Sequence, residues 1–229
     1  MLIKSALLTQ ASGSIGGMTA GHNKGGLYLR GRGNMTNPNS TAQQTVRTAL
    51  SNLVADWGGL SAAIRDGWAT YALNVPKTNP LGDPIFLSGQ QWYLACNVAR
   101  VRAAMTQVDT APTVYSEAIL SPVTIAPDAA AATFDVAFDN TDQWANENTG
   151  ALIVQVSRQM NASRNFFKGP FRFAAKTLGS TITPPTSPAT LTNPFAETYT
   201  AGNRVYARAR AVLADGRISA VQIVTGLAA

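Results

Sequence analysis

Apolar residues between positions 46 and 57 recur with the period of a helix. They fall at offsets of 4, 7, 8 and 11 from Val46, which places them on one helix face. Ser40 and Gln43 precede this run with the spacing of a capping box. Gly58-Gly59 follows it and is expected to end the helix. The pattern therefore predicts a first helix that starts after Ser40.

Two further runs have the same period. Ser61 is a good N-cap for a helix carrying Trp68 and Tyr71, which Pro76 would close. Ser88 and Gln91 form a second capping box, before a run that extends to Met105. We therefore expect three short helices between residues 37 and 110, with their tryptophans at core positions. Cys96 lies in the third of them and is predicted to be a buried apolar residue.

Beyond residue 123 the period becomes two, as in half-buried strands. Alternating runs lie around Phe134–Phe138, Leu152–Val156 and Phe171–Ala175. The clearest element is a hairpin in which residues 205–213 and 218–225 flank Ala214-Asp215-Gly216-Arg217, because Asp-Gly between two alternating runs is a strong hairpin signal. These runs predict an antiparallel β-sandwich over residues 124–229.

The first 36 residues are rich in Gly, Ser and Thr and have no helical period. Leu27 and Leu29 alternate with Tyr28 and Arg30, as in a short strand, and His22–Gly25 is a plausible turn. We expect an extended arm or an open hairpin here. The predicted fold class is α+β, with an arm (1–36), a helical domain (37–110), a linker (111–123) and a sandwich (124–229).

The charge is low and unevenly placed. Only 13% of the 229 residues are charged, against about 25% in an average globular protein, so the surface is either covered by neutral polar side chains or buried against other subunits. The formal net charge is +6. Up to residue 55 the chain has no acid and five basic residues: Lys4, Lys24, Arg30, Arg32 and Arg47. The arm should therefore favour an acidic partner.

No motif of catalysis or cofactor binding stands out. The single histidine, His22, lies in the glycine-rich arm, and one His with one Cys cannot form a zinc site. Asp135, Asp139, Asp142 and Glu147 lack calcium-loop spacing, so we interpret them as a solvated strand end. The glycines of the arm fit neither the dinucleotide nor the Walker pattern. We expect no enzyme activity, no metal and no cofactor, although an unmarked carboxylate pair of a hydrolase leaves no signature to search for.

Eight residues are candidates for partner binding. Arginine suits bidentate pairing with carboxylates, so docking of the arm on an acidic protein surface is favoured over binding of nucleic acid, for which so few charges are too sparse. A solvated arm without a partner is the alternative. Arg204, Arg208 and Arg210 share a strand face with Tyr206, either as an exposed face or as a second contact patch. Trp144 lies in a polar loop and either contacts a partner or plugs its own sandwich. The candidates are Lys24, Tyr28, Arg30, Arg32, Arg47, Trp144, Arg208 and Arg210.

Two resemblances follow from these residues. The run Tyr206–Ala211 with its aromatic-x-Arg-x-Arg-Ala pattern, followed by Asp215-Gly216-Arg217-Ile218-Ser219, resembles the last two strands of a fibronectin type III domain. The early tryptophan usual in that family is missing, so the wider immunoglobulin-like class is the expectation. The arm with Arg30-Gly31-Arg32, the Asn37-Pro38 stop, Trp57 and Trp68 are similar to a group of small phage and prophage virion proteins.

The second resemblance implies a virion structural protein. We expect a capsid decoration, cement or minor capsid protein that binds other virion proteins, such as major capsid or tail subunits, and copies of itself. The alternative is a component of the tail tip or baseplate, or an adhesin that binds a host receptor or surface glycan. No apolar run approaches the roughly 20 residues of a membrane span, and the start lacks the apolar core of a signal peptide. Synthesis in the host cytoplasm without secretion is therefore expected, with no membrane partner.

Overall fold

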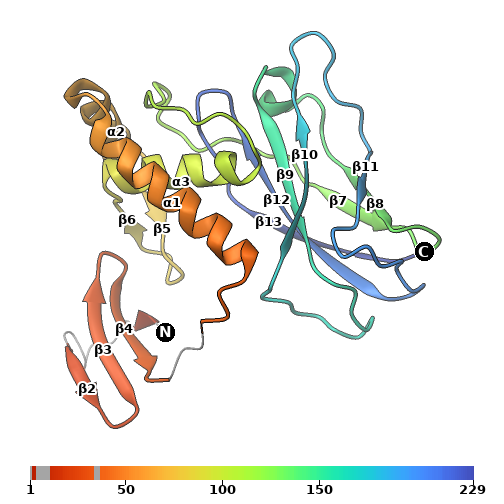
Figure 1. Ribbon diagram of the computed structural model, residues 1–229, viewed down its shortest axis with the longest axis horizontal. Helices are drawn as coiled ribbons and strands as arrows, with labels where there is room; N and C mark the ends of the chain where they lie inside the picture. The colour runs from red at the N-terminus through yellow and green to blue at the C-terminus, as the bar shows by residue number, and fades with distance from the viewer. Residues whose placement is uncertain (1, 4–10, 34–36) are drawn as a thin grey trace. The chain divides into compact units, whose positions relative to one another are not determined.

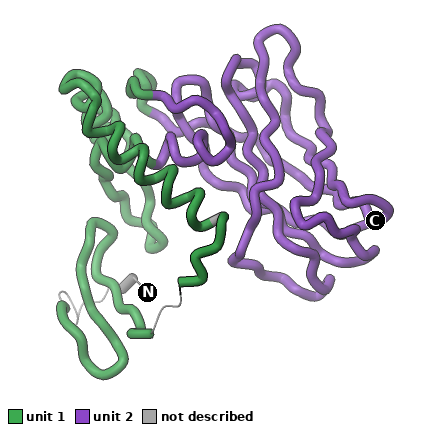
Figure 2. Tube along the Cα trace, viewed as in Figure 1, with its two compact units in different colours: residues 1–94, 109–115 green, residues 95–108, 116–229 purple. Residues whose placement is uncertain are grey.

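The computed structural model describes residues 2–3, 11–33 and 37–229. The chain divides into two compact units (Figure 2). The first holds residues 1–94 and 109–115, and the second holds residues 95–108 and 116–229. The division between them falls within the third helix. The limits at residues 36, 110 and 123 remain predictions as domain boundaries.

The N-terminal segment forms a small antiparallel sheet in the order β1-β4-β3-β2 (Figure 1). The strands are β1 (Leu2–Ile3), β2 (Gly13–Ile15), β3 (Met18–Asn23) and β4 (Gly26–Gly31). The strand predicted around Leu27 is confirmed as β4, and its hairpin with β3 is the centre of the sheet. The glycine-rich segment is thus a regular sheet and not an open arm. Backbone hydrogen bonds between the strands order it, because its small side chains can form little core of their own.

Three helices follow: α1 (Thr41–Gly59), α2 (Ala62–Asn74) and α3 (Gly89–Arg102). The capping box of α1 is present, with the Ser40 hydroxyl accepting from the Gln43 N–H and the Gln43 side chain accepting from the Ser40 N–H. Ser61 caps α2 in the same way through its hydroxyl. The expected stop at Gly58-Gly59 is confirmed: α1 ends at Gly59, and Leu60 is the extended C-cap.

Edge-to-face aromatic contacts hold the core of the first unit. The Tyr71 ring lies 5.9 Å from the Trp68 ring and 5.3 Å from that of Trp92, with nearly perpendicular planes in both pairs. All three side chains are buried, as predicted, whereas Trp57, which was also expected in the core, is only half-buried. The inner face of α1 is narrower than expected: Ala49 and Leu53 are buried, whereas Leu50 and Val54 are more than 40% exposed. A short ladder joins β5 (Lys77–Thr78) to β6 (Pro84–Ile85).

The second unit contains an antiparallel β-sandwich, as expected (Figure 1). One sheet has the order β10-β9-β12-β13 and the other the order β11-β8-β7. The strands are β7 (Thr124–Pro127), β8 (Thr133–Ala137), β9 (Ala151–Val156), β10 (Arg172–Leu178), β11 (Ala189–Thr192), β12 (Arg204–Val212) and β13 (Gln222–Leu227). With three helices elsewhere in the described chain, this is an α+β protein with an immunoglobulin-like sandwich.

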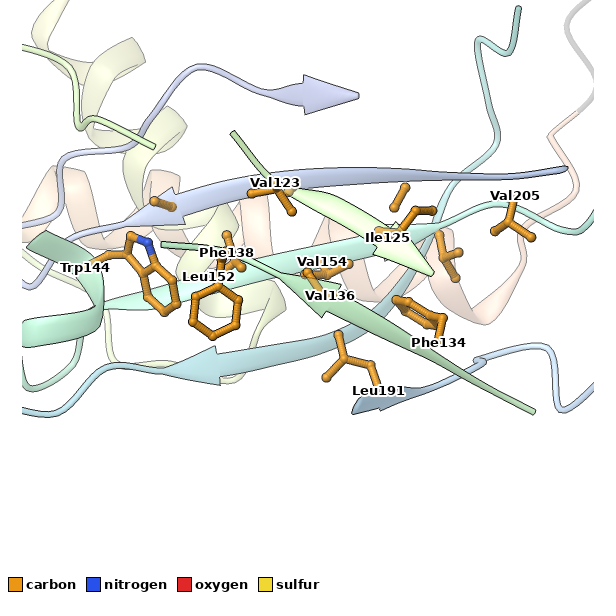
Figure 3. Packing of buried hydrophobic residues seen from close by; sticks show 14 of the residues in the cluster. Val123, Ile125, Phe134, Val136, Phe138, Trp144, Leu152, Val154, Leu191 and Val205 are labelled. Carbon is orange, nitrogen blue, oxygen red and sulfur yellow. The ribbon is translucent and has the colours of Figure 1, made fainter. Parts of the chain in front are cut away.

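Alternating side chains of the two sheets meet to form the sandwich core (Figure 3). Phe134 and Val136 from β8 face Leu152 and Val154 from β9, and all four are almost completely buried. The β12–β13 connection contains the predicted Asp-Gly turn, with Gly216 at a φ of +94°, a conformation that side-chain-bearing residues rarely adopt. Regular pairing with β13 begins only at Gln222, four residues later than predicted.

Candidate interaction surfaces

The N-terminal sheet has one polar face and one apolar face. Across the β3–β4 pair, Tyr28 lies opposite Gly21 and Arg30 opposite Thr19, so these four share the polar face. The Tyr28 hydroxyl lies 2.8 Å from where a Cβ on Gly21 would stand, so the glycine makes room for the ring. Tyr28 is therefore half-buried against its own sheet, and little of its ring is available to a partner.

The three candidate cations of this sheet are exposed. Lys24 lies in the β3–β4 turn, Arg30 lies on β4, and Arg32 directly follows that strand. The Arg32 N–H donates to the Gly17 carbonyl at 2.7 Å, which continues the pairing past the strand end. Lys4, which completes the charge count of the segment, lies outside the described residues. The sheet thus brings the predicted cations to one small element.

Arg47 has a local structural role. Its guanidinium donates to the Asn37 side-chain oxygen at 2.9 Å and to that of Asn39 at 3.5 Å. These bonds hold the segment that leads into α1, eight to ten residues before the arginine. The side chain is still exposed, so it is a weaker candidate for partner binding than the cations of the sheet.

The apolar face of the sheet has an uncovered end. Ile15 on β2 pairs directly with Met18 on β3, and their side chains are 85% and 48% exposed. On the same face, Leu27 is 4% exposed. The apolar face is therefore buried at one end and open to solvent at the other. This pair was not among the predicted site residues, although the isolated isoleucine between glycines could have indicated it.

The prediction that Trp144 contacts a partner is wrong. The residue lies in the 3₁₀ helix η1 (Gln143–Asn146), its side chain is fully buried, and its ring packs edge-to-face on Phe138 at 5.0 Å (Figure 3). The other interpretation, that it plugs its own sandwich, is correct. The polar residues around it in sequence face solvent, while the short helix turns the indole inward.

The strand face predicted for β12 is confirmed. Val205, Ala207 and Ala209 point into the core, so Arg204, Tyr206, Arg208 and Arg210 lie on the opposite face of the sheet. Cross-strand neighbours place Gln155 and Ile223 on either side of Arg208 on this face. Arg208 is exposed, and Arg204 and Arg210 are partly buried.

The two candidate arginines of this face have different environments. Burial lowers the pKa of Arg210, the neighbouring Arg208 lowers it further, and Glu117 partly offsets both. The Arg210 Nε has no hydrogen-bond partner in the described structure. Arg210 is therefore partly enclosed by its own unit, and Arg208 is the arginine of this pair that a ligand can reach.

The loop between β9 and β10 adds a basic and aromatic group to this face. Phe167 stacks on Tyr206 with ring centroids 5.6 Å apart, and the Tyr206 hydroxyl donates to the Arg164 carbonyl at 2.6 Å. The next residue back, Phe166, is 73% exposed. The sequence analysis missed the charge of this loop.

That charge has a clear signal in the sequence. No Asp or Glu occurs from residue 148 to residue 196, a stretch with five cations: Arg158, Arg164, Lys168, Arg172 and Lys176. Counting charge over all 174 residues after residue 55 hides this segment, because ten acids precede it and two follow it. A sliding count would have found it.

The described residues give no support for a metal centre or a membrane span. Within ranges 2–3, 11–33 and 37–229, no three His, Cys, Asp or Glu side chains are close enough together to hold a metal ion. His22 lies exposed on β3, and Cys96 is buried, as predicted. No helix of the described chain combines the length and apolar character needed to cross a membrane.

Comparisons with known proteins identify no family. No family model and no curated protein matches the chain. Among solved structures, it is similar to a Fn3-like protein from Clostridium thermocellum, with 13% identity and a TM-score of 0.30 over 49% of this chain and 94% of that one. A likeness at this level says nothing about what either of the two surfaces binds.

Proposed function

We propose that the chain is a structural protein of a phage particle, most simply a capsid decoration, cement or minor capsid protein. Its N-terminal sheet would bind neighbouring virion subunits. The observation that supports this is the open apolar end of that sheet, formed by Ile15 and Met18. Exposed apolar side chains that lie side by side on a basic element are typical of an interaction site, because burying them against a partner is more favourable than leaving them in water.

The sheet offers three complementary kinds of contact. The exposed pair can be buried against an apolar patch, at roughly 25 cal/mol for each Å² removed from water. Arg30, on the polar face of the same sheet, and Arg32, just past the end of β4, can pair with carboxylates of a neighbouring subunit. The edge strand β2 leaves backbone groups available to a neighbouring strand. Each contact is weak alone, but many copies on one particle would bind strongly together.

The location of the protein is tested on purified particles of a phage that encodes this chain, by gold labelling and electron microscopy. Regular label over the head, with loss of heat resistance when the gene is deleted, supports decoration. Label restricted to the tail would instead place the protein in a tip or baseplate. Particles without label would overturn the virion proposal.

The role of the sheet is tested with two matched substitutions. Ile15→Glu places a charge in the open apolar end, whereas Ile182→Glu does the same at a loop residue of the sandwich that is 87% exposed. We expect particles to incorporate the Ile15 variant at least tenfold less, and the Ile182 variant normally. Equal incorporation of both variants would mean that the sheet does not dock the protein.

A further inference from the structure

The β9–β10 loop and the outer face of β12 together form a cationic and aromatic patch. The Arg164 guanidinium lies 5.5 Å from the centre of the Phe167 ring, which in turn stacks on Tyr206. Arg204 and Arg208 flank Tyr206 on the same strand face. These residues, with the exposed Phe166 and Lys168, are called the loop patch below.

The loop patch is held rigid beneath and open above. Phe167 is 8% exposed and packs against Phe171, with the two ring centroids 5.1 Å apart. It also stacks on Tyr206, which is itself 5% exposed. The Arg164 Nε also donates to the Phe166 carbonyl at 3.0 Å. The backbone on each side of Phe166 is therefore fixed, and the side chain of Phe166 projects into solvent from an anchored loop.

The cations of the loop patch lack acidic partners. In the part of the chain that the structure describes, no carboxylate forms an ion pair with Lys168, Arg204 or Arg208. Glu197, the acid nearest to Arg204 in sequence, is already paired with Arg158. The Arg204 Nε is buried and has no hydrogen-bond partner. A patch with this unbalanced charge is complementary to an anion, and arginine suits carboxylate in particular.

We infer that the loop patch binds an acidic polysaccharide, with the ring of Phe166 against a sugar face and Lys168 and Arg208 on its carboxylates. Three features favour a glycan. A single exposed aromatic ring is a platform for one sugar. The amides of Gln155 and Asn165 lie beside the patch and can bond to hydroxyl groups. The patch has few cations, and about 13 Å separates the Cα atoms of Arg204 and Arg208. Its positive charges therefore match the widely spaced carboxylates of an acidic polysaccharide.

Single-stranded nucleic acid fits less well. Proteins that bind it present several aromatic rings on which successive bases stack. In the loop patch only Phe166 is widely exposed, because Phe167 and Tyr206 are stacked on each other and buried. The inference is independent of the virion proposal, since it concerns another surface and can be measured on the isolated protein.

The test is calorimetric titration of the full chain with oligogalacturonate and with oligosialate, which carry a carboxylate on each sugar. The methyl-esterified galacturonate oligomer, an uncharged match, and an oligo(dT) strand are the comparison ligands. We expect binding of at least one acidic oligomer and at least tenfold weaker binding of the uncharged match and of oligo(dT). Absence of binding to both acidic oligomers, equal binding of the uncharged match, or tighter binding of oligo(dT) would overturn the inference.

Substitutions locate the site. Lys168→Gln and Arg208→Gln each remove one unpaired cation, and Phe166→Ala removes the exposed ring; each should weaken binding about tenfold. Arg65→Gln removes an exposed cation from α2 and is the matched control, with unchanged binding expected. If the Arg65 variant weakens binding as much as the others, the attraction is general to the basic protein and no site exists here.

Discussion

Replacing Trp144 with alanine should destabilise the sandwich severely, although the sequence places this residue in a polar loop. The side chain is 0% exposed and belongs to the main core cluster. Truncating a buried tryptophan to alanine costs about 3–5 kcal/mol, through lost burial and the cavity that remains. The edge-to-face contact with Phe138 contributes about 0.5–1.5 kcal/mol of this.

The indole nitrogen makes a second, finer test. The Trp144 Nε1 is buried and has no hydrogen-bond partner in the described structure. Leaving such a donor unsatisfied costs about 1–3 kcal/mol, so Trp144→Phe loses volume but also removes this penalty. We therefore expect Trp144→Phe to cost less than about 1.5 kcal/mol. Phe166→Ala, at the exposed loop aromatic, should change stability by less than about 0.5 kcal/mol.

Urea unfolding followed by far-UV circular dichroism measures these differences. With a slope of about 2 kcal/mol per molar urea, a loss of 4 kcal/mol lowers the midpoint by about 2 M. The other three tryptophans lie in residues 1–94, so in both Trp144 variants fluorescence reports the first unit alone. A midpoint for Trp144→Ala within 0.5 M of the wild type, on the order of 1 kcal/mol at this slope, would refute the assignment of this residue to the core.

Three further predictions concern single positions. Ser40→Ala removes the capping box of α1 and should cost about 1 kcal/mol in urea unfolding, whereas Ser51→Ala, exposed within the same helix, should cost nothing. Gly216→Ala forces a side chain onto a φ of +94° and should lower the free energy of unfolding by about 1–2 kcal/mol. Gly58→Ala, in the last turn of α1 with open space around it, should instead raise it by up to about 1 kcal/mol. A change of the same sign in both variants would contradict the turn geometry. Burial raises the pKa of Tyr199 to about 12, so its neutral form favours the folded state, and that contribution should be complete below pH 10 and lost as the pH rises toward 12. Absorbance titration at high pH checks this, since Tyr199→Phe should remove one of the late-titrating tyrosines without loss of stability at pH 7.

Local patterns determined the elements of this protein. The capping boxes at Ser40 and Ser88 are visible in the sequence, because a cap depends only on residues three positions apart. The alternation in β12 was enough to place Arg208 and Tyr206 on the outer face and Ala207 in the core, since the side-chain period of a strand is two. The α+β class followed from the change of period near residue 123.

Only the tertiary structure decided which of these side chains are accessible. Trp144 and Phe166 both lie in polar stretches of sequence, yet one is fully buried and the other is 73% exposed. The difference comes from contacts with other segments of the chain. Trp144 packs in the core cluster with residues of β8, β9 and β12, while Tyr206 holds Phe167 and leaves Phe166 outside. Burial is a sum of contacts between distant segments, so no local pattern of hydrophobic and polar residues can contain it.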